Sequence, residues 1–403
     1  MAKGNPYIRV QYLKIKDKKL PYSSRIEIID RKNKNYELHI KDTTANMQED
    51  FANIESIAVW MWSVDQDIKV KFRYDTYHGE KDKGAENRGK PWNGKELIQP
   101  CYRGENGHIY AEATRLHHMR FLYRVMRFSE RYKEKFELSD KSNQAEVYNF
   151  RKLYNAALNN GKLRITEPET EAGLKDGNSK KIARDKPKKV LENHLEKWFV
   201  LESDRKELIE KTEIIEEVAH KFGNNKLYDQ MPCCVFYENV AARSRIFNSG
   251  YFDLWGINDK QELCVFELKK TGNNKLGIIS ELFFYAMIMK DMKVIVKRKH
   301  SDTATDCRGF NVFKESKENK PINAFFLVPE LHWSLKTVRS DFIKVLNEVD
   351  DGIQFDVIEF KEDKLIEDDI YKNLKDKWKE YLEKAKAGLK KDTIERQNIG
   401  TME

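Results

Sequence analysis

The sequence predicts an α/β domain with a mixed sheet flanked by helices in its C-terminal half, preceded by a separate α+β domain. Apolar runs alternate with helical periodicity over residues 188–362, which favours the α/β domain. Shorter alternating runs and two long helical patterns fill residues 1–165. Residues 166–187 hold almost no apolar side chains, which is typical of a linker. A charged segment, 363–403, ends the chain.

Individual elements follow from the spacing of apolar residues. In the N-terminal part we expect strands over 36–40 and 68–72 and helices over 112–133 and 145–158. Trp60 and Trp62 are two residues apart, so on a strand they would share a face, where we expect core packing rather than base stacking. In the C-terminal part we expect a strand pair within 250–268 and strands over 292–296, 324–328 and 355–360. We also expect helices over 190–200, 278–290 and 367–389, and one more helix between the last two strands.

Composition narrows the class of protein. The 403 residues are 40% hydrophobic and 35% charged, with a formal net charge of +8, and a mildly basic chain suits a polyanionic partner. No apolar run is long enough to span a bilayer and no apolar signal core begins the chain, so we expect a cytoplasmic protein that does not bind membranes. Five cysteines without a Cys-x-x-Cys pair argue against a zinc site or a disulfide framework.

Three ionisable residues stand out within the strand pair at 250–268. Glu267 and Lys269 are two residues apart, so both point to the same face of a strand. If the chain reverses at the polar turn 258–260, Asp253 lies nearly opposite Glu267, with Cβ atoms roughly 5 Å apart. Two carboxylates at that spacing can share a divalent cation, with a lysine one pleat away.

Phosphodiester hydrolysis uses these residue types. Hard carboxylate oxygens bind Mg²⁺ while leaving positions for water and phosphate. The ammonium of Lys269 would orient the attacking water and offset charge in the transition state. The alternative is a surface hairpin with an ordinary cross-strand salt bridge. Because the charges interrupt otherwise apolar strands, where unpaired charges are costly, we favour the catalytic interpretation.

The segments Gly-Tyr-Phe-Asp-Leu-Trp-Gly and Val-Phe-Glu-Leu-Lys-Lys, joined by the polar turn, resemble the core of the PD-(D/E)xK nuclease superfamily. Phe252 stands where that family usually has proline. The resemblance covers about 175 residues and implies a restriction-endonuclease-like fold. It also implies an Mg²⁺ or Mn²⁺ ion held by Asp253, Glu267 and the main-chain carbonyl of Leu268, with Lys269 as the catalytic lysine.

The flanking helices extend this resemblance. Glu192 and Glu196 lie one turn apart on the helix at 190–200, which is similar to the helix before the core in EndoMS/NucS mismatch endonucleases and Shedu-type antiphage nucleases. Either acid would reach the metal, and we prefer Glu192; the alternative is a solvated helix face. After the lysine, many members carry Gln-x-x-x-Tyr. This chain has Glu281 and Tyr285 there, so the glutamate departs from the pattern and Tyr285 is either a substrate contact or a core residue.

Arginines offer a candidate nucleic-acid interface. Arg120, Arg124, Arg127 and Arg131 recur at steps of four, three and four, so they line one face of the helix at 112–133. Such a row would follow phosphates with a steep salt dependence; the alternative is a solvated basic face paired with acids. Arg243 and Arg245 precede the catalytic strand and are also predicted to contact the substrate.

Together these observations predict an endonuclease that cleaves DNA with Mg²⁺ or Mn²⁺. The N-terminal part would select the substrate or sense a trigger. The resemblance favours antiphage defence, with repair or mismatch cleavage second, and a homodimer or homotetramer, because two strands need two active sites. Two alternatives remain: a catalytically idle nucleic-acid-binding protein, and a nuclease gated by a small ligand bound to the N-terminal part.

Overall fold

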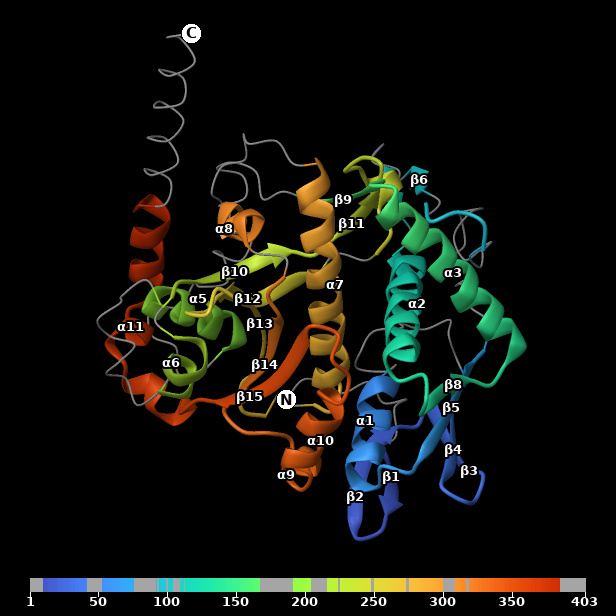
Figure 1. Ribbon diagram of the computed structural model, residues 1–403. Helices are drawn as coiled ribbons and strands as arrows, with labels where there is room; N and C mark the ends of the chain where they lie inside the picture. Colours follow the sequence, from blue (N-terminus) through green and yellow to red (C-terminus); the bar gives the residue numbers. More distant parts are fainter. Residues whose placement is uncertain are drawn as a thin grey trace.

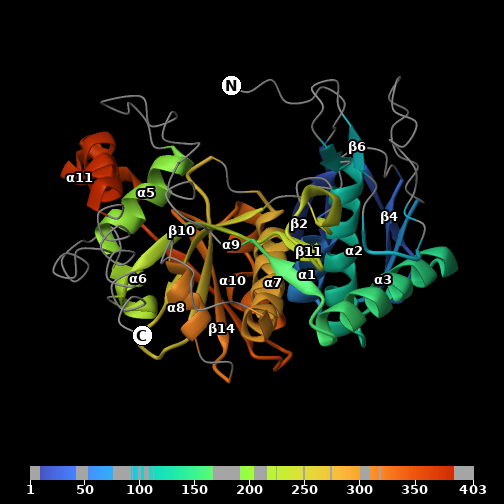
Figure 2. The same cartoon turned by 90° about the horizontal axis from the view of Figure 1, so that it is seen from above.

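A computed structural model gives a mixed α/β protein built from two main sheets with helices between and outside them (Figure 1). It describes residues 10–41, 53–75, 92, 94–98, 101–103, 109–111, 113–166, 191–203, 216–223, 225–247, 250–272, 275–299, 309–316 and 319–384. Both views place the C-terminal sheet between the α5 side and α7, with the N-terminal layer beyond α7 (Figures 1 and 2). The predicted mixed α/β class is confirmed.

The C-terminal sheet has five strands in the order β10-β12-β13-β14-β15. Its first two pairings are antiparallel and its last two are parallel. The central strand β13 is buried along its whole length, as expected of an apolar run that is covered on both faces. The strands are β10 (Leu227–Pro232), β12 (Tyr251–Ile257), β13 (Leu263–Leu268), β14 (Ile322–Val328) and β15 (Ile353–Glu359).

Helices cover the two faces of this sheet. Alternate side chains of β13 enter different cores: Phe266 and Leu268 pack with the α5 side, whereas Val265 joins the larger core on the α7 side. The first side holds α5 (Glu192–Ser203), α6 (Glu216–Phe222), η5 (Glu362–Glu367), α11 (Asp369–Lys372) and helical residues 374–384. The second side holds α7 (Ile278–Lys299), α8 (Phe310–Glu315), α9 (Trp333–Lys336) and α10 (Arg339–Leu346).

The N-terminal layer contains a four-stranded sheet in the order β3-β4-β5-β8 and two long helices. Asp140 begins the second of these helices, because its side chain accepts hydrogen bonds from the first free N–H groups. The elements are β1 (Val10–Ile15), β2 (Lys18–Ser23), β3 (Ile26–Asp30), β4 (Asn35–Ile40), α1 (Ile54–Val64), β5 (Lys69–Tyr74), β6 (Cys101–Arg103), β7 (Ile109–Ala111), α2 (Ala113–Arg131), β8 (Phe136–Leu138), α3 (Lys141–Asn159) and β9 (Leu163–Ile165).

The N-terminal layer shares an apolar core with the C-terminal part. One apolar core runs from its sheet through α1, α2 and α3 to α7 and the C-terminal sheet. Strand β9 pairs with β11 (Val235–Tyr237), which is followed by the short helix η3 (Ala242–Ser244). The indole N–H of Trp60 donates to the carbonyl of Ser334, 3.1 Å away and buried. The expected linker lies outside the described residues except for Thr166.

Most predicted elements are present, with ends displaced by a few residues. The predicted strand over 292–296 is wrong, because these residues continue α7. A short apolar run does not by itself distinguish a strand from a buried helix, and α7 is buried on nearly every side. Trp60 and Trp62 lie on helix α1 rather than on a strand, but both are buried, which confirms their expected place in the core.

Helix α7 lies between the two halves of the molecule (Figure 2). The structure describes 22 residues of this helix. It packs against β13 and β14 on one side and against α1, α2 and α3 on the other. Although α7 is largely apolar, no helix within the described ranges is both long enough and apolar enough to cross a membrane.

Candidate active site

The predicted hairpin is confirmed, and it brings Asp253 opposite Glu267. Strands β12 and β13 are antiparallel, with Leu254 opposite Phe266 as the last regular pair. One residue further along this register, Asp253 and Glu267 face each other across the strands. The main-chain N–H of Leu268 donates to the Asp253 carboxylate over 3.0 Å. The acid of one strand is therefore anchored to the backbone of the other.

Lys269 follows β13 directly and lies among carboxylates from three elements. Its ammonium pairs with Glu267 of the same strand, with Glu281 of α7 at 3.2 Å and with Glu192 of α5 at 3.7 Å. The structure thus brings the three predicted catalytic residues together between α5 and α7. It also adds Glu281, which the sequence pattern marked only as a departure from glutamine.

The electrostatics of this cluster reflect burial. Burial raises the pKa of Asp253 to about 6, although Lys269 and the Leu268 N–H favour its charged form. Burial and the charge of Asp253 raise the pKa of Glu267 well above its ordinary value. For Lys269, burial opposes the charge, but the carboxylates of Glu267 and Glu281 outweigh it and raise the pKa. The cluster holds more buried negative charge than one lysine neutralises.

A divalent cation fits this arrangement. Glu267 is only 2% exposed, and its Oε2 atom is buried without a hydrogen-bond partner in the described structure. An unsatisfied buried carboxylate oxygen is costly, and a hard cation would satisfy it. No group of three or more His, Cys, Asp or Glu side chains in the described ranges is placed to hold a metal ion. The ligand set expected here is of another kind, because it combines only two carboxylates with the main-chain carbonyl of Leu268.

Both predicted acids of helix α5 face the site, but they differ in burial and in the groups that they contact. Glu192, which the sequence favoured slightly, is partly exposed and faces Lys269. Glu196, one turn later, is buried and accepts a hydrogen bond of 2.7 Å from the Gln230 side chain. Burial and the charge of Asp253 raise the pKa of Glu196 to about 8. Glu192 likewise raises the pKa of Asp253, so both helix acids act on this carboxylate, and the expectation of a solvated face does not hold for the buried Glu196.

The arginine row of α2 does not form a surface for phosphates. Arg124 is fully buried and its guanidinium lies 3.5 Å from Glu55. Arg127 pairs with Asp291 at 2.9 Å, and Arg131 donates to main-chain carbonyls and pairs with Asp351. These three predicted contacts are corrected, because Arg124 pairs with α1 and Arg127 and Arg131 hold α2 against the C-terminal part of the protein. The pairing with acids that the alternative interpretation expected is present, but on a largely buried face rather than a solvated one.

The other predicted substrate contacts lie in three environments. Arg120 is buried, with its guanidinium carbon 3.9 Å from the ring centre of Phe284. Tyr285 is partly buried and packs edge-on against Phe252. Arg245 is half-buried, and Arg243 in η3 is exposed. Arg243 is therefore the predicted arginine that a polyanion reaches most directly.

Replacing Arg124 by alanine is expected to destabilise the fold rather than weaken nucleic-acid binding. Removing one partner of a buried ion pair costs about 3–5 kcal/mol, because the other charge stays buried. Urea denaturation measures this loss. The matched control, Arg243→Ala, should change stability by no more than about 0.5 kcal/mol. Equal stability of the two variants would contradict the assignment of Arg124.

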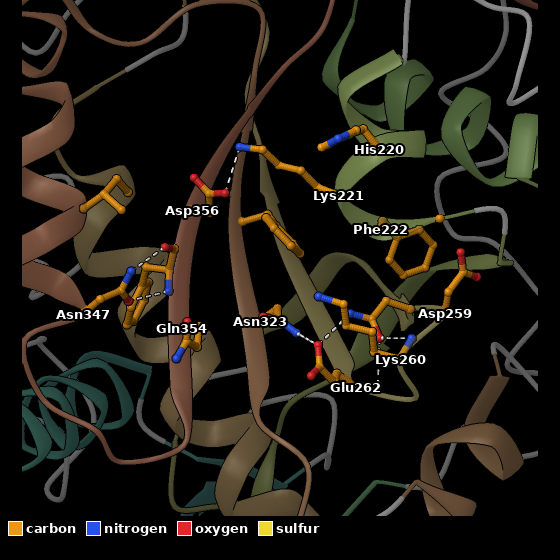
Figure 3. A pocket seen from close by; sticks show the side chains of 15 residues that line it. His220, Lys221, Phe222, Asp259, Lys260, Glu262, Asn323, Asn347, Gln354 and Asp356 are labelled. Carbon is orange, nitrogen blue, oxygen red and sulfur yellow. Dashed lines mark hydrogen bonds and ion pairs between the residues drawn. The ribbon is translucent and has the colours of Figure 1, made fainter.

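A pocket of about 640 Å³ lies at the opposite end of the sheet from Lys269, around the hairpin turn and the first residues of β14 and β15 (Figure 3). Several of its polar side chains pair with one another. The amide of Asn323 donates to Glu262 over 2.9 Å, and Lys221 points toward Asp356, 2.8 Å away. The charges that line it are mixed, and none of the predicted catalytic residues reaches it.

Comparisons of this chain with family models, curated proteins and solved structures give no match. The chemistry of the site therefore rests on the residues described above, and above all on Asp253, Glu267 and Lys269.

Proposed function

We propose that the protein is a metal-dependent endonuclease that hydrolyses phosphodiester bonds of DNA, with a restriction-endonuclease-like arrangement of its C-terminal part. The observation that carries this proposal is the meeting of two buried carboxylates, Asp253 and Glu267, with the ammonium of Lys269. Buried like charges persist where they serve a site. The unsatisfied oxygen of Glu267 supports a cation at that place.

Each group has a role in the proposed reaction. Asp253, Glu267 and the carbonyl of Leu268 would hold Mg²⁺ or Mn²⁺, with Glu196 beside Asp253 as a further acid. The bound ion would polarise the phosphoryl group and lower the pKa of a water molecule. Lys269 donates hydrogen bonds toward the attacking water and offsets the charge that develops on the phosphate. Glu281 and Glu192 hold its ammonium at the site.

The proposed setting is antiphage defence in the cytoplasm, as a homodimer or homotetramer; repair or mismatch cleavage is the second setting. This rests on the pattern of residues shared with Shedu-type and EndoMS/NucS-like nucleases. A catalytically idle nucleic-acid-binding protein would not need an intact lysine among buried acids.

A cleavage panel tests the proposal. The purified chain is incubated with linear, circular, single-stranded and mismatched DNA and with RNA, in Mg²⁺, Mn²⁺ or EDTA. We expect cleavage of at least one DNA substrate that requires the metal. Metal-dependent cleavage of RNA alone would change the substrate class. No cleavage of any substrate would contradict the proposed function.

The acids also predict a pH-dependent effect of Mg²⁺ on stability. Burial raises the pKa of Asp253 to about 6 and that of Glu196 to about 8. Without metal, the folded state therefore binds more protons than the unfolded state up to about pH 8, and these groups make stability fall as pH rises. Because Mg²⁺ competes with those protons, it should raise the melting temperature more at pH 8.5 than at pH 6. Equal Mg²⁺ effects at both pH values would contradict this.

A further inference from the structure

A chain of fully buried polar groups joins α1 of the N-terminal layer to the first turn of α7. The hydroxyl of Ser280 donates to the Glu55 carboxylate over 2.8 Å. The main-chain N–H of Ser280 donates to the hydroxyl of Ser56 over 3.2 Å. All three residues are 0% exposed. These contacts link positions more than 220 residues apart in the sequence.

A buried ion pair extends this row of polar groups to α2. The guanidinium of Arg124 lies 3.5 Å from Glu55, and neither side chain is exposed. A buried ion pair adds little stability compared with apolar residues of the same volume, because both charges lose their hydration. Polar groups of this kind instead specify one arrangement of the elements that they join. Here those elements are α1, α2 and α7.

The first turn of α7 also carries a contact of the candidate active site. Ser280 directly precedes Glu281, whose carboxylate lies 3.2 Å from the ammonium of Lys269. Figure 1 shows α1 beside the beginning of α7, and α1 and α7 are in contact. A displacement of this turn would therefore move Glu281 relative to Lys269. Misplacing a catalytic group by about 1 Å can reduce a rate up to about 100-fold.

We propose that Glu55 and Ser280 are positioning residues for the candidate active site. Through them, the N-terminal layer fixes the turn of α7 that carries Glu281, and Glu281 holds the ammonium of Lys269. This inference rests on the proposed nuclease function. It gives the N-terminal layer an indirect part in the reaction, through the position of Glu281, besides any selection of substrate.

Steady-state kinetics of Ser280→Ala test this inference. Loss of the hydroxyl should lower kcat about 10-fold and leave KM within about 2-fold of wild type, because binding of the substrate is not involved. The matched control is Asp291→Asn. Asp291 joins the same helix to α2 through Arg127 and Tyr123, but about three turns further along α7. We expect this variant to lose stability in thermal melting and to keep the wild-type kcat.

A double-mutant cycle separates positioning from general destabilisation. In a Glu281→Ala background, Ser280→Ala should lower kcat no further, since its effect acts through Glu281. An unchanged kcat in Ser280→Ala, equal losses of kcat in Ser280→Ala and Asp291→Asn, or additive losses in the cycle would each overturn the inference. Wild-type protein that cleaves no nucleic acid would instead overturn the proposed function, so the two failures are distinguishable.

Discussion

Replacing Lys269 by alanine is expected to reduce DNA cleavage about 10²–10³-fold while a divalent cation still binds. The ammonium is the cationic group among Glu267, Glu281 and Glu192. Its removal leaves the two proposed metal-ligating carboxylates in place but takes away the charge that offsets the transition state. Single-turnover cleavage rates and Mn²⁺ titration followed by paramagnetic resonance measure the two effects separately.

The chain provides a matched control in the next residue. Lys270→Ala also removes one lysine charge from the same loop, but within the described residues the ammonium of Lys270 donates a hydrogen bond of 3.4 Å to the Thr271 carbonyl and pairs with none of the acids of the site. We expect this variant to cleave DNA at a rate within about 3-fold of wild type, since the removed charge lies outside the cluster of acids around Lys269. A Lys269→Ala variant as active as Lys270→Ala would remove the lysine from the mechanism.

The second large effect is expected for Asp253→Asn, which should abolish metal-dependent cleavage and stabilise the metal-free protein. Asparagine can still accept the hydrogen bond from the Leu268 N–H, but it does not carry the buried charge that opposes Glu267 and Glu196. Burial raises the pKa of Asp253 from 3.8 to about 6. Because one pKa unit corresponds to about 1.4 kcal/mol, the free energy of unfolding at pH 8 should rise by about 1–3 kcal/mol.

Chemical denaturation with and without Mg²⁺ checks both halves of this expectation. Mg²⁺ should stabilise the wild type but not Asp253→Asn. The control is Asp259→Asn at the exposed turn of the same hairpin, where the carboxylate accepts a hydrogen bond from Asn225. This variant should keep both the cleavage and the Mg²⁺ effect. A less stable metal-free Asp253→Asn protein would show that the acids do not repel one another as inferred.

Local rules account for what the sequence could predict of the site. Strand alternation puts Glu267 and Lys269 on one face, and the polar turn sets the register that brings Asp253 across. Both depend on residues that are close in the sequence. The one-turn spacing of Glu192 and Glu196 likewise placed both acids on one helix face, but only the packing of α5 decided that Glu196 is the buried one.

The arginine row shows why other expectations failed. The spacing correctly put the four arginines on one face of α2, but it gave no information on what covers that face. The partner acids lie far away in the sequence, on α1 for Arg124 and on α7 for Arg127. The same long-range packing joins the N-terminal layer to α7, which a search for linkers could not reveal. The contact of Glu281 with Lys269 also depends on long-range packing, because it is set by where α7 crosses β13.

The most direct test of the central claim is the anomalous-scattering map of crystals of the protein soaked in Mn²⁺. We expect a Mn²⁺ peak between the carboxylates of Asp253 and Glu267, next to the carbonyl of Leu268, and no such peak in crystals of Asp253→Asn. A protein that cleaves DNA while Mn²⁺ occupies another part of the structure would contradict the assignment of Asp253 and Glu267 as metal ligands.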